Sequence, residues 1–140
     1  MPLPDLTSLR GAAVKESAER RRLAAAQLAS ARSTAQAQAP ALRAYLESCA
    51  RDGINQDKPA GRLDFRFGAV KFVFSKQDPD YVAGVEVREA VVRAFVAESR
   101  RAGYRVSAKK VDFETDYLSQ LLDHPFERGT AWDITIRWKV

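Results

Sequence analysis

The sequence predicts an α+β protein with a mostly antiparallel four-stranded sheet and a helix packed on one face, preceded by a long alanine-rich helix and a short amphipathic helix. Three observations lead to this prediction. Apolar and polar residues alternate along 62–75, 104–114 and 132–140, as in strands that bury one face. Apolar residues recur at helical spacing along 79–102. Residues 5–39 are rich in the strong helix formers Ala, Leu, Arg, Glu and Gln, and contain no aromatic side chain.

The chain divides into an alanine-rich helical arm, residues 1–39, and a single α+β domain, residues 40–140. Thr7 or Ser8 is expected to cap the helix of the arm. The arm has no large apolar side chain after Leu28. Alanine faces allow another helix to approach closely, so we expect the arm to dock on a neighbouring subunit or on its own domain, or else to stand as a solvated helix.

A long coiled coil with a leucine seam is not expected in the arm. Leu6, Leu9 and Ala13 begin a heptad pattern, but Glu16 and Arg20 interrupt it. Any packing of the arm is therefore expected to use its alanine-rich faces.

Pro40 is expected to separate the arm from the short amphipathic helix, because proline disfavours helix at the preceding residue and suits a first helical turn. Cys49 is the one cysteine of the chain, which excludes an intramolecular disulfide bond. Its position on an apolar stripe indicates a buried structural thiol. The stripe and the glycine expected to end the helix comprise Leu42, Tyr45, Leu46, Cys49 and Gly53.

The stretch 62–75, RLDFRFGAVKFVFS, is predicted to form a β-hairpin. Its apolar alternation slips by one position at Gly68 and Ala69. A two-residue type II′ turn, with Gly68 in the positive-φ position, explains the slip. The turn places six large apolar side chains on one face: Leu63, Phe65, Phe67, Val70, Phe72 and Phe74.

The next helix is expected to start with Asp78 as N-cap and Pro79 as first residue, and to end near Ala102, before Gly103. Arg88 falls near the middle of its apolar arc. A buried arginine needs a carboxylate or carbonyl partner, or it extends to the edge of the sheet. The alternative is a role in binding an anionic group.

The C-terminal part predicts two more strands with a short helix between them. In 104–114 the alternation changes phase at Lys109 and Lys110, which suggests a bulge or bend. Residues 115–123 fit a short helix, and residues 124–129 fit a loop. The strand 132–140 alternates without interruption.

Charge and hydropathy restrict the classes of partner. The 140 residues include 23 Lys and Arg against 18 Asp and Glu, giving a formal charge of +5 and a pI near 9.6. This balance favours polyanions or acidic protein surfaces as partners. The N-terminus lacks the apolar core of a signal peptide, and no stretch is long and apolar enough to span a membrane. We therefore expect a soluble cytoplasmic protein without a membrane partner; a place in a virion is also compatible.

The sequence contains no recognisable catalytic, cofactor or metal motif. His124 is the single histidine, lies far along the chain from Cys49, and has no GxSxG or similar motif beside it. No phosphate-cradling glycine loop occurs. The acidic segment from Asp112 to Glu127 fails the EF-hand pattern, because Tyr117 stands where the loop requires glycine. We assign no catalytic residue, no cofactor and no metal ligand.

The strongest surface signal is the set of outward positions on the predicted sheet, which we call the basic face. Asp64 and Asp133 are the acidic residues on it. Three interpretations remain open: contact with nucleic-acid phosphates, docking to an acidic protein surface or a neighbouring copy, or simple solvation. Because the outward positions carry no aromatic residue, stacking on bases is not expected. The seven cations of the basic face are Arg62, Arg66, Lys71, Arg105, Lys109, Arg137 and Lys139.

Together these features predict a non-enzymatic protein-interaction or assembly subunit, of the accessory or structural type found in phages, that uses the arm and the basic face. The expected partners are an acidic protein surface or neighbouring copies of the chain. The alternative is a nucleic-acid-binding protein that contacts the backbone with low sequence specificity.

Overall fold

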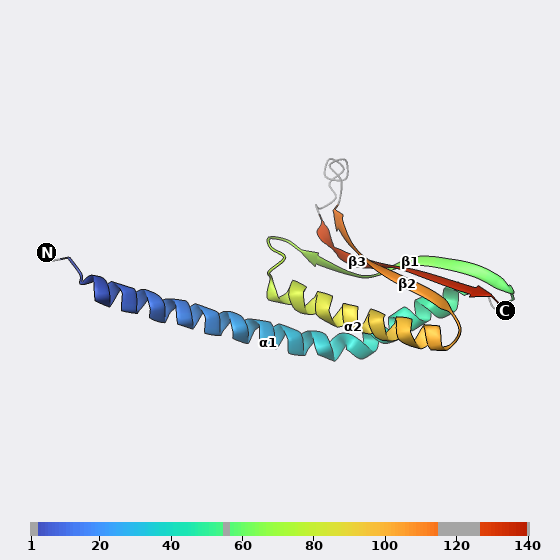
Figure 1. Ribbon diagram of the computed structural model, residues 1–140, viewed down its shortest axis with the longest axis horizontal. Helices are drawn as coiled ribbons and strands as arrows, with labels where there is room; N and C mark the ends of the chain where they lie inside the picture. The colour runs from blue at the N-terminus through green and yellow to red at the C-terminus, as the bar shows by residue number, and fades with distance from the viewer. Residues whose placement is uncertain (1–2, 55–56, 115–126, 140) are drawn as a thin grey trace.

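Two helices lie on one side of a three-stranded antiparallel sheet, and the first part of the first helix projects far beyond it (Figure 1). The structure is a computed structural model that describes residues 3–54, 57–114 and 127–139. The α+β class is confirmed, with three strands in place of the predicted four. The elements in chain order are α1 (Leu6–Gly53), β1 (Ala60–Phe72), α2 (Pro79–Arg101), β2 (Arg105–Glu114) and β3 (Arg128–Lys139).

The stretch predicted to form a hairpin is instead the single strand β1, so that prediction was wrong. On one side of the slip Phe67 lies opposite Trp132, and on the other Val70 lies opposite Thr130. Two residues of β1 therefore oppose one residue of β3, which is a β-bulge. Gly68 has a φ of 74° and supplies the left-handed conformation that the bulge needs. The bulge returns the apolar side chains to the core face, as the turn would have done.

The end of the predicted apolar set lies outside the core. Phe72 packs against the core at the end of β1. Phe74, beyond the strand, is 98% exposed, and its neighbour Val73 is 82% exposed. Five of the six predicted side chains thus pack in or against the core, and the sixth does not.

α1 runs through Pro40 without a break, so the predicted division into two helices was wrong. Proline removes one backbone donor and disfavours a helix interior. Here Ala39 and Leu42, on either side of it, pack against the buried clusters, and this tertiary packing maintains the helix. Figure 1 shows α1 changing direction in its cyan part, as an interior proline causes. The last turns thereby reach the sheet, where Leu46 is fully buried.

The start of α1 also differs from the prediction. Asp5 is the N-cap, and its carboxylate accepts a hydrogen bond from the backbone N–H of Thr7 at 3.2 Å. Thr7 and Ser8 lie within the first turn instead. For α2, the predicted cap Asp78 and first residue Pro79 are confirmed.

The core lies between the sheet and the helices. Its largest fully buried side chains are Phe67 of β1, Leu46 of α1, Ile134 and Ile136 of β3, and Val87 of α2. α1, α2, β1 and β3 therefore share one core, and displacing any one of them removes apolar contacts from the other three.

α1 and α2 pack closely through small side chains. Ala31 and Ala35 of α1 are buried in one cluster with Ala83 of α2. Beside them Arg32 donates two hydrogen bonds to Glu86, from Nε at 2.9 Å and from Nη2 at 2.8 Å. Part of the alanine-rich sequence thus packs within the chain's own domain.

β3 lies in the middle of the sheet and pairs antiparallel with both neighbours. The pairing of β2 with β3 runs without a register shift, so the bulge predicted at Lys109 and Lys110 was wrong. The change of phase has another cause: Val111 and Phe113 face away from the helices, opposite Ala131 and Gly129. The predicted helix 115–123 and the first part of the predicted loop lie outside the described residues.

Candidate functional site

The first exposed feature is the N-terminal part of α1, which we call the projecting segment, residues 6–27. Every residue in it is exposed. Leu28 is the first half-buried residue of α1, and Ala31 is the first buried one. At the rise of an α-helix the projecting segment is about 33 Å long. Figure 1 shows it extending away from the sheet and from α2.

The projecting segment exposes large apolar side chains that lack a packing partner in the described part of the chain. Leu6 is 69% exposed, Val14 70% and Leu23 61%. In proteins, most of the stability of a helix comes from tertiary packing of one of its faces rather than from helix propensity. Leucine and valine at such exposure are also unfavourable in contact with water. Both facts favour a partner that covers the segment.

The face of α1 that packs on α2 continues into the projecting segment. Ala31 and Ala35 define this face. At 100° per residue, Ala24, Ser17 and Ala13 lie on the same side of the helix. At these three positions small side chains let a second helix approach closely. Arg20, which lies about 20° from Ala13 around the helix and bonds Glu16, would border the contact.

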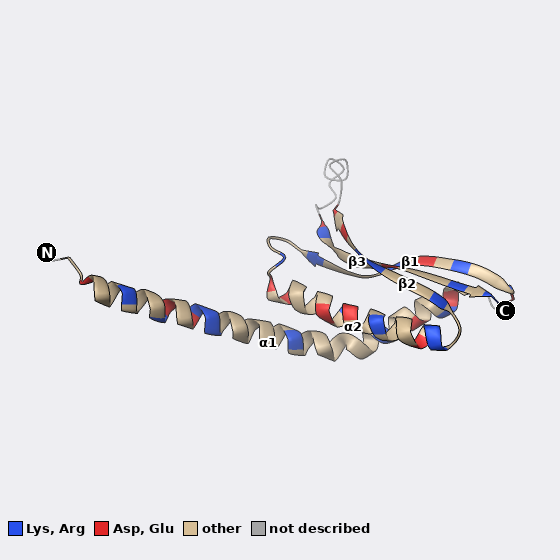
Figure 2. Ribbon diagram, in the orientation of Figure 1, with Lys and Arg blue, Asp and Glu red and all other residues tan. Residues whose placement is uncertain are grey.

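The second exposed feature is the basic face. The strand register places all seven predicted cations on the side of the sheet opposite the helices, and each residue is exposed. Figure 2 shows Lys and Arg in blue on all three strands. The structure separates the seven into two environments that the sequence did not distinguish.

In the first environment the cations have carboxylate partners. Arg66 Nε donates to Asp133 Oδ1 at 2.8 Å, and Lys109 lies directly across the sheet from Asp133. The hydrogen bond from Arg66 lowers the pKa of the Asp133 carboxyl, and the charge of Lys109 adds to the shift. Lys71 pairs with Glu127 at 2.7 Å. In this part of the basic face, three cations are thus balanced by two carboxylates.

In the second environment three arginines stand side by side across the sheet. Arg62 on β1 lies opposite Arg137 on β3, and Arg137 lies opposite Arg105 on β2. We call these three residues the arginine row. Lys139 is two residues beyond Arg137 on the same strand and face. The sequence could not predict the row, because it forms only when β3 lies between the other two strands.

One carboxylate lies next to the arginine row. Asp64 accepts a hydrogen bond from Arg62 Nε at 2.7 Å and another from the hydroxyl of Thr135 at 2.6 Å. The hydrogen bond from Arg62 lowers the pKa of the Asp64 carboxyl most. The charge of Arg137 also lowers the pKa of Asp64, but within the described ranges neither Arg105 nor Arg137 lies within 4 Å of a carboxylate oxygen as an ion pair.

Arg88 has a backbone carbonyl as partner, one of the partners expected for a buried arginine. Its Nη1 donates to the backbone carbonyl of Gly84 at 3.2 Å. Its Nε is buried and has no hydrogen-bond partner among the described residues. Burial lowers the pKa of the guanidinium. The side chain lies beneath the bulge, where its Cδ would be 3.1 Å from a Cβ placed on Gly68.

Replacing Arg88 with methionine is expected to raise the free energy of unfolding by about 1 kcal/mol, because it removes a buried donor that lacks an acceptor. Thermal or chemical denaturation of the purified protein measures the change. Arg93→Met is the matched control, since the side chain of Arg93 is 79% exposed on the same helix. A loss of stability in Arg88→Met would show that the guanidinium contributes more than it costs.

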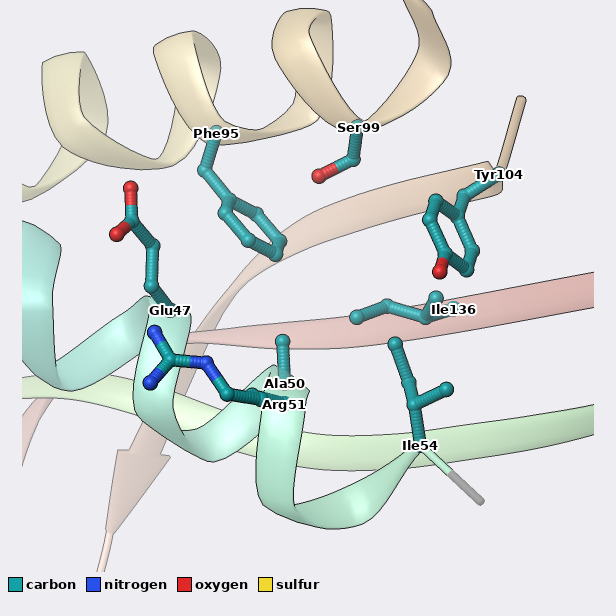
Figure 3. Close-up of a pocket in the computed structure, with 8 residues that line it drawn as sticks. All are labelled: Glu47, Ala50, Arg51, Ile54, Phe95, Ser99, Tyr104 and Ile136. Carbon is teal, nitrogen blue, oxygen red and sulfur yellow. The ribbon is translucent and has the colours of Figure 1, made fainter. Parts of the chain in front are cut away.

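A cavity of about 300 Å³ lies where the C-terminal ends of α1 and α2 meet the sheet. Figure 3 shows Phe95 and Ser99 of α2 on one side of it, Ala50 and Ile54 at the end of α1 on the other, and Ile136 of β3 between them. Glu47, at its rim, already accepts a hydrogen bond from Arg43 Nε at 2.7 Å. The volume is at the lower limit for small-molecule sites, and its lining suits a packing gap between the two helices.

The acidic segment considered as a metal site lies partly outside the described residues, as does His124. Asp112, which is described, accepts a hydrogen bond from Thr130 at 2.9 Å and from Lys76 at 3.4 Å. Among the residues with defined positions, no three His, Cys, Asp or Glu side chains are grouped to hold a metal ion. Neither α1 nor α2 contains a stretch apolar enough to cross a membrane.

Comparison with known proteins gives no relative. No family model matches the chain, and no curated protein or solved structure matches it significantly.

Proposed function

We propose that the protein is a non-enzymatic assembly subunit that binds a neighbouring copy of itself through the projecting segment. The observation that carries the proposal is that residues 6–27 form a helix whose every residue is exposed. A helix of this length usually persists because tertiary contacts cover one of its faces. A second protein chain would provide these contacts.

The expected contact face is the row of small side chains at Ala13, Ser17 and Ala24, which we call the alanine stripe. It continues the face that α2 covers at Ala31 and Ala35, so a helix of similar character fits against it. Ala24, Ser17 and Ala13 would lie at the centre of such a contact. α1 of a second copy carries the same stripe. When the two stripes face each other, both helices contribute small side chains to the contact, and their backbones can approach closely.

The charges of the projecting segment work against pairing between copies. It holds five cations and two carboxylates, and Arg20 bonds Glu16 one turn away at 2.5 Å. Two identical helices therefore repel one another, and the contact between copies has to come from their small and apolar side chains. Homo-oligomers with closed symmetry are the commonest protein assemblies.

Sedimentation velocity of the full chain over a range of concentrations tests this proposal. We expect a species whose mass is a multiple of 15.6 kDa. Ala24→Glu is expected to raise the dissociation constant by about a hundredfold or more, because it places a charge without a partner in a close helix contact. A monomer at every concentration would contradict the proposal.

Ala26→Glu is the matched control. Ala26 is also exposed, lies two residues away, and faces the opposite side of α1. Both variants change charge and helix propensity equally, so only the face of the helix differs. Equal effects of the two substitutions on self-association would exclude the alanine stripe as the contact.

A further inference from the structure

The arginine row places three exposed arginines on one face of the described sheet. Arg62, Arg137 and Arg105 are on neighbouring strands and directly opposite one another. Adjacent strands are about 5 Å apart, so the three positive charges start from closely spaced backbone positions. We propose that the arginine row binds the phosphate backbone of a nucleic acid.

The row has an excess of positive charge that the described residues compensate only in part. Asp64 is hydrogen-bonded to Arg62 and Thr135 and also interacts electrostatically with Arg137. No carboxylate of the described chain forms an ion pair with Arg105 or Arg137, and Lys139 adds a fourth cation beside Arg137. The rest of the basic face differs, since Arg66 and Lys71 have acidic partners.

Like charges directly opposite one another in a sheet destabilise the pairing. The sheet carries two such arginine pairs in one row, Arg62 with Arg137 and Arg137 with Arg105. An anion bound across the row would convert this repulsion into attraction. The strand pairing holds the three arginines on adjacent strands before any ligand binds, so the ligand need not bring them together.

The density of charge favours phosphates over protein carboxylates. Duplex DNA carries about one negative charge per 1.7 Å of helix axis, which matches closely spaced cations. Guanidinium also binds phosphate oxygens through two parallel hydrogen bonds. Neighbouring carboxylates on a protein surface repel one another, so an acidic protein would match the row less well.

The residues around the row predict binding to the backbone rather than to bases. The neighbouring outward positions are Ser107, Thr135 and Asp64, none of which stacks on a base. Aromatic side chains are what single-strand binders use for stacking. The one described aromatic residue on this face of β2, Phe113, lies at the other end of the strand opposite Gly129. Low sequence specificity is therefore expected.

Fluorescence anisotropy with a short labelled DNA duplex tests the inference on the full chain. With three phosphate contacts, the slope of log K against log salt concentration is expected to be about −3. The double variant Arg105→Gln/Arg137→Gln is expected to weaken binding by about tenfold or more at low salt. Its slope should be smaller in magnitude by about 2 units. The variant should fold, because it removes repulsion from the sheet.

Arg93→Gln/Arg101→Gln is the matched control, since both arginines are exposed on α2 and the net charge changes equally. It is expected to keep the slope of the wild type. Arg137→Lys should also keep the slope but bind more weakly. Lysine retains the positive charge but cannot form the two parallel hydrogen bonds that a guanidinium makes to phosphate oxygens.

Three results would overturn the inference: no duplex binding at low salt, equal losses in the two double variants, or equally tight binding of poly-glutamate. The last result would assign the row to an acidic protein partner. The arginine row lies on the sheet and the alanine stripe lies on α1. Ala24→Glu therefore tests self-association without changing the arginine row, and the two proposals can fail independently.

Discussion

Replacing Leu46 with alanine is expected to lower the free energy of unfolding by about 3 kcal/mol. Leu46 has no exposed surface and lies in the main core cluster, in the part of α1 that meets the sheet. Shortening it leaves a cavity that α1 cannot easily fill, because Ala50 of the same helix is also buried in the cluster. Chemical denaturation followed by circular dichroism measures the loss.

Leu23→Ala is the matched control, since Leu23 belongs to the same helix and is 61% exposed. Its expected effect on the unfolding of the domain is below about 0.5 kcal/mol. Similar losses in the two variants would mean that the projecting segment unfolds together with the core, and would contradict the division between them.

Replacing Gly129 with alanine is expected to cost about 2 to 3 kcal/mol of stability. A Cβ at this position would lie 2.2 Å from the carbonyl oxygen of Val70 and 2.8 Å from the ring of Phe113. Because the carbonyl of Val70 belongs to the backbone, the clash with the new Cβ is relieved only if β1 and β3 separate just beyond the bulge. A fall in the denaturation midpoint measures the effect.

Gly11→Ala is the comparison variant, and it is expected to stabilise its helix instead of destabilising the protein. A Cβ on Gly11 would meet nothing within 4 Å, and alanine favours a helix interior by about 1 kcal/mol over glycine. We expect a stronger helical signal and no loss of domain stability. If Gly129→Ala were tolerated as well as Gly11→Ala, that result would contradict the close packing of β1, β2 and β3 around Gly129.

The sequence predicted the class of fold and most of the core face, because both follow from periodicity. Alternation along 62–75 correctly assigned Leu63, Phe65 and Phe67 to the core side. It could not distinguish a turn from a bulge, because each shifts the alternation by one residue. The difference depends on whether β3 is long enough to pair on both sides of Gly68, and that is a tertiary property.

Two other errors have the same origin. Pro40 is a local signal to end a helix, and packing around Ala39 and Leu42 overrides it. The phase change near Lys110 is a local signal for a bulge, and Phe113 covering Gly129 explains it without one. In each case a neighbour distant in the sequence decided the outcome.

The candidate sites were predictable to different degrees. Alternation alone indicated which cations share a face of the sheet. The strand order determines which of them are adjacent, so the arginine row could not be deduced from the pattern along any single strand. The alanine content indicated helix packing, but the sequence did not indicate that close packing on α2 would begin only near Ala31.

The order of the strands leaves the described sheet with two open edges, at β1 and at β2. Open edges are templates on which further strands can add, and proteins commonly protect them with lysines and bulges. Here β2 carries Lys109 and Lys110 in succession, on opposite faces, and β1 is interrupted at Gly68. Each edge thus carries a feature that discourages strand addition and aggregation. Partners of the sheet are therefore expected to bind across its charged face instead of extending it.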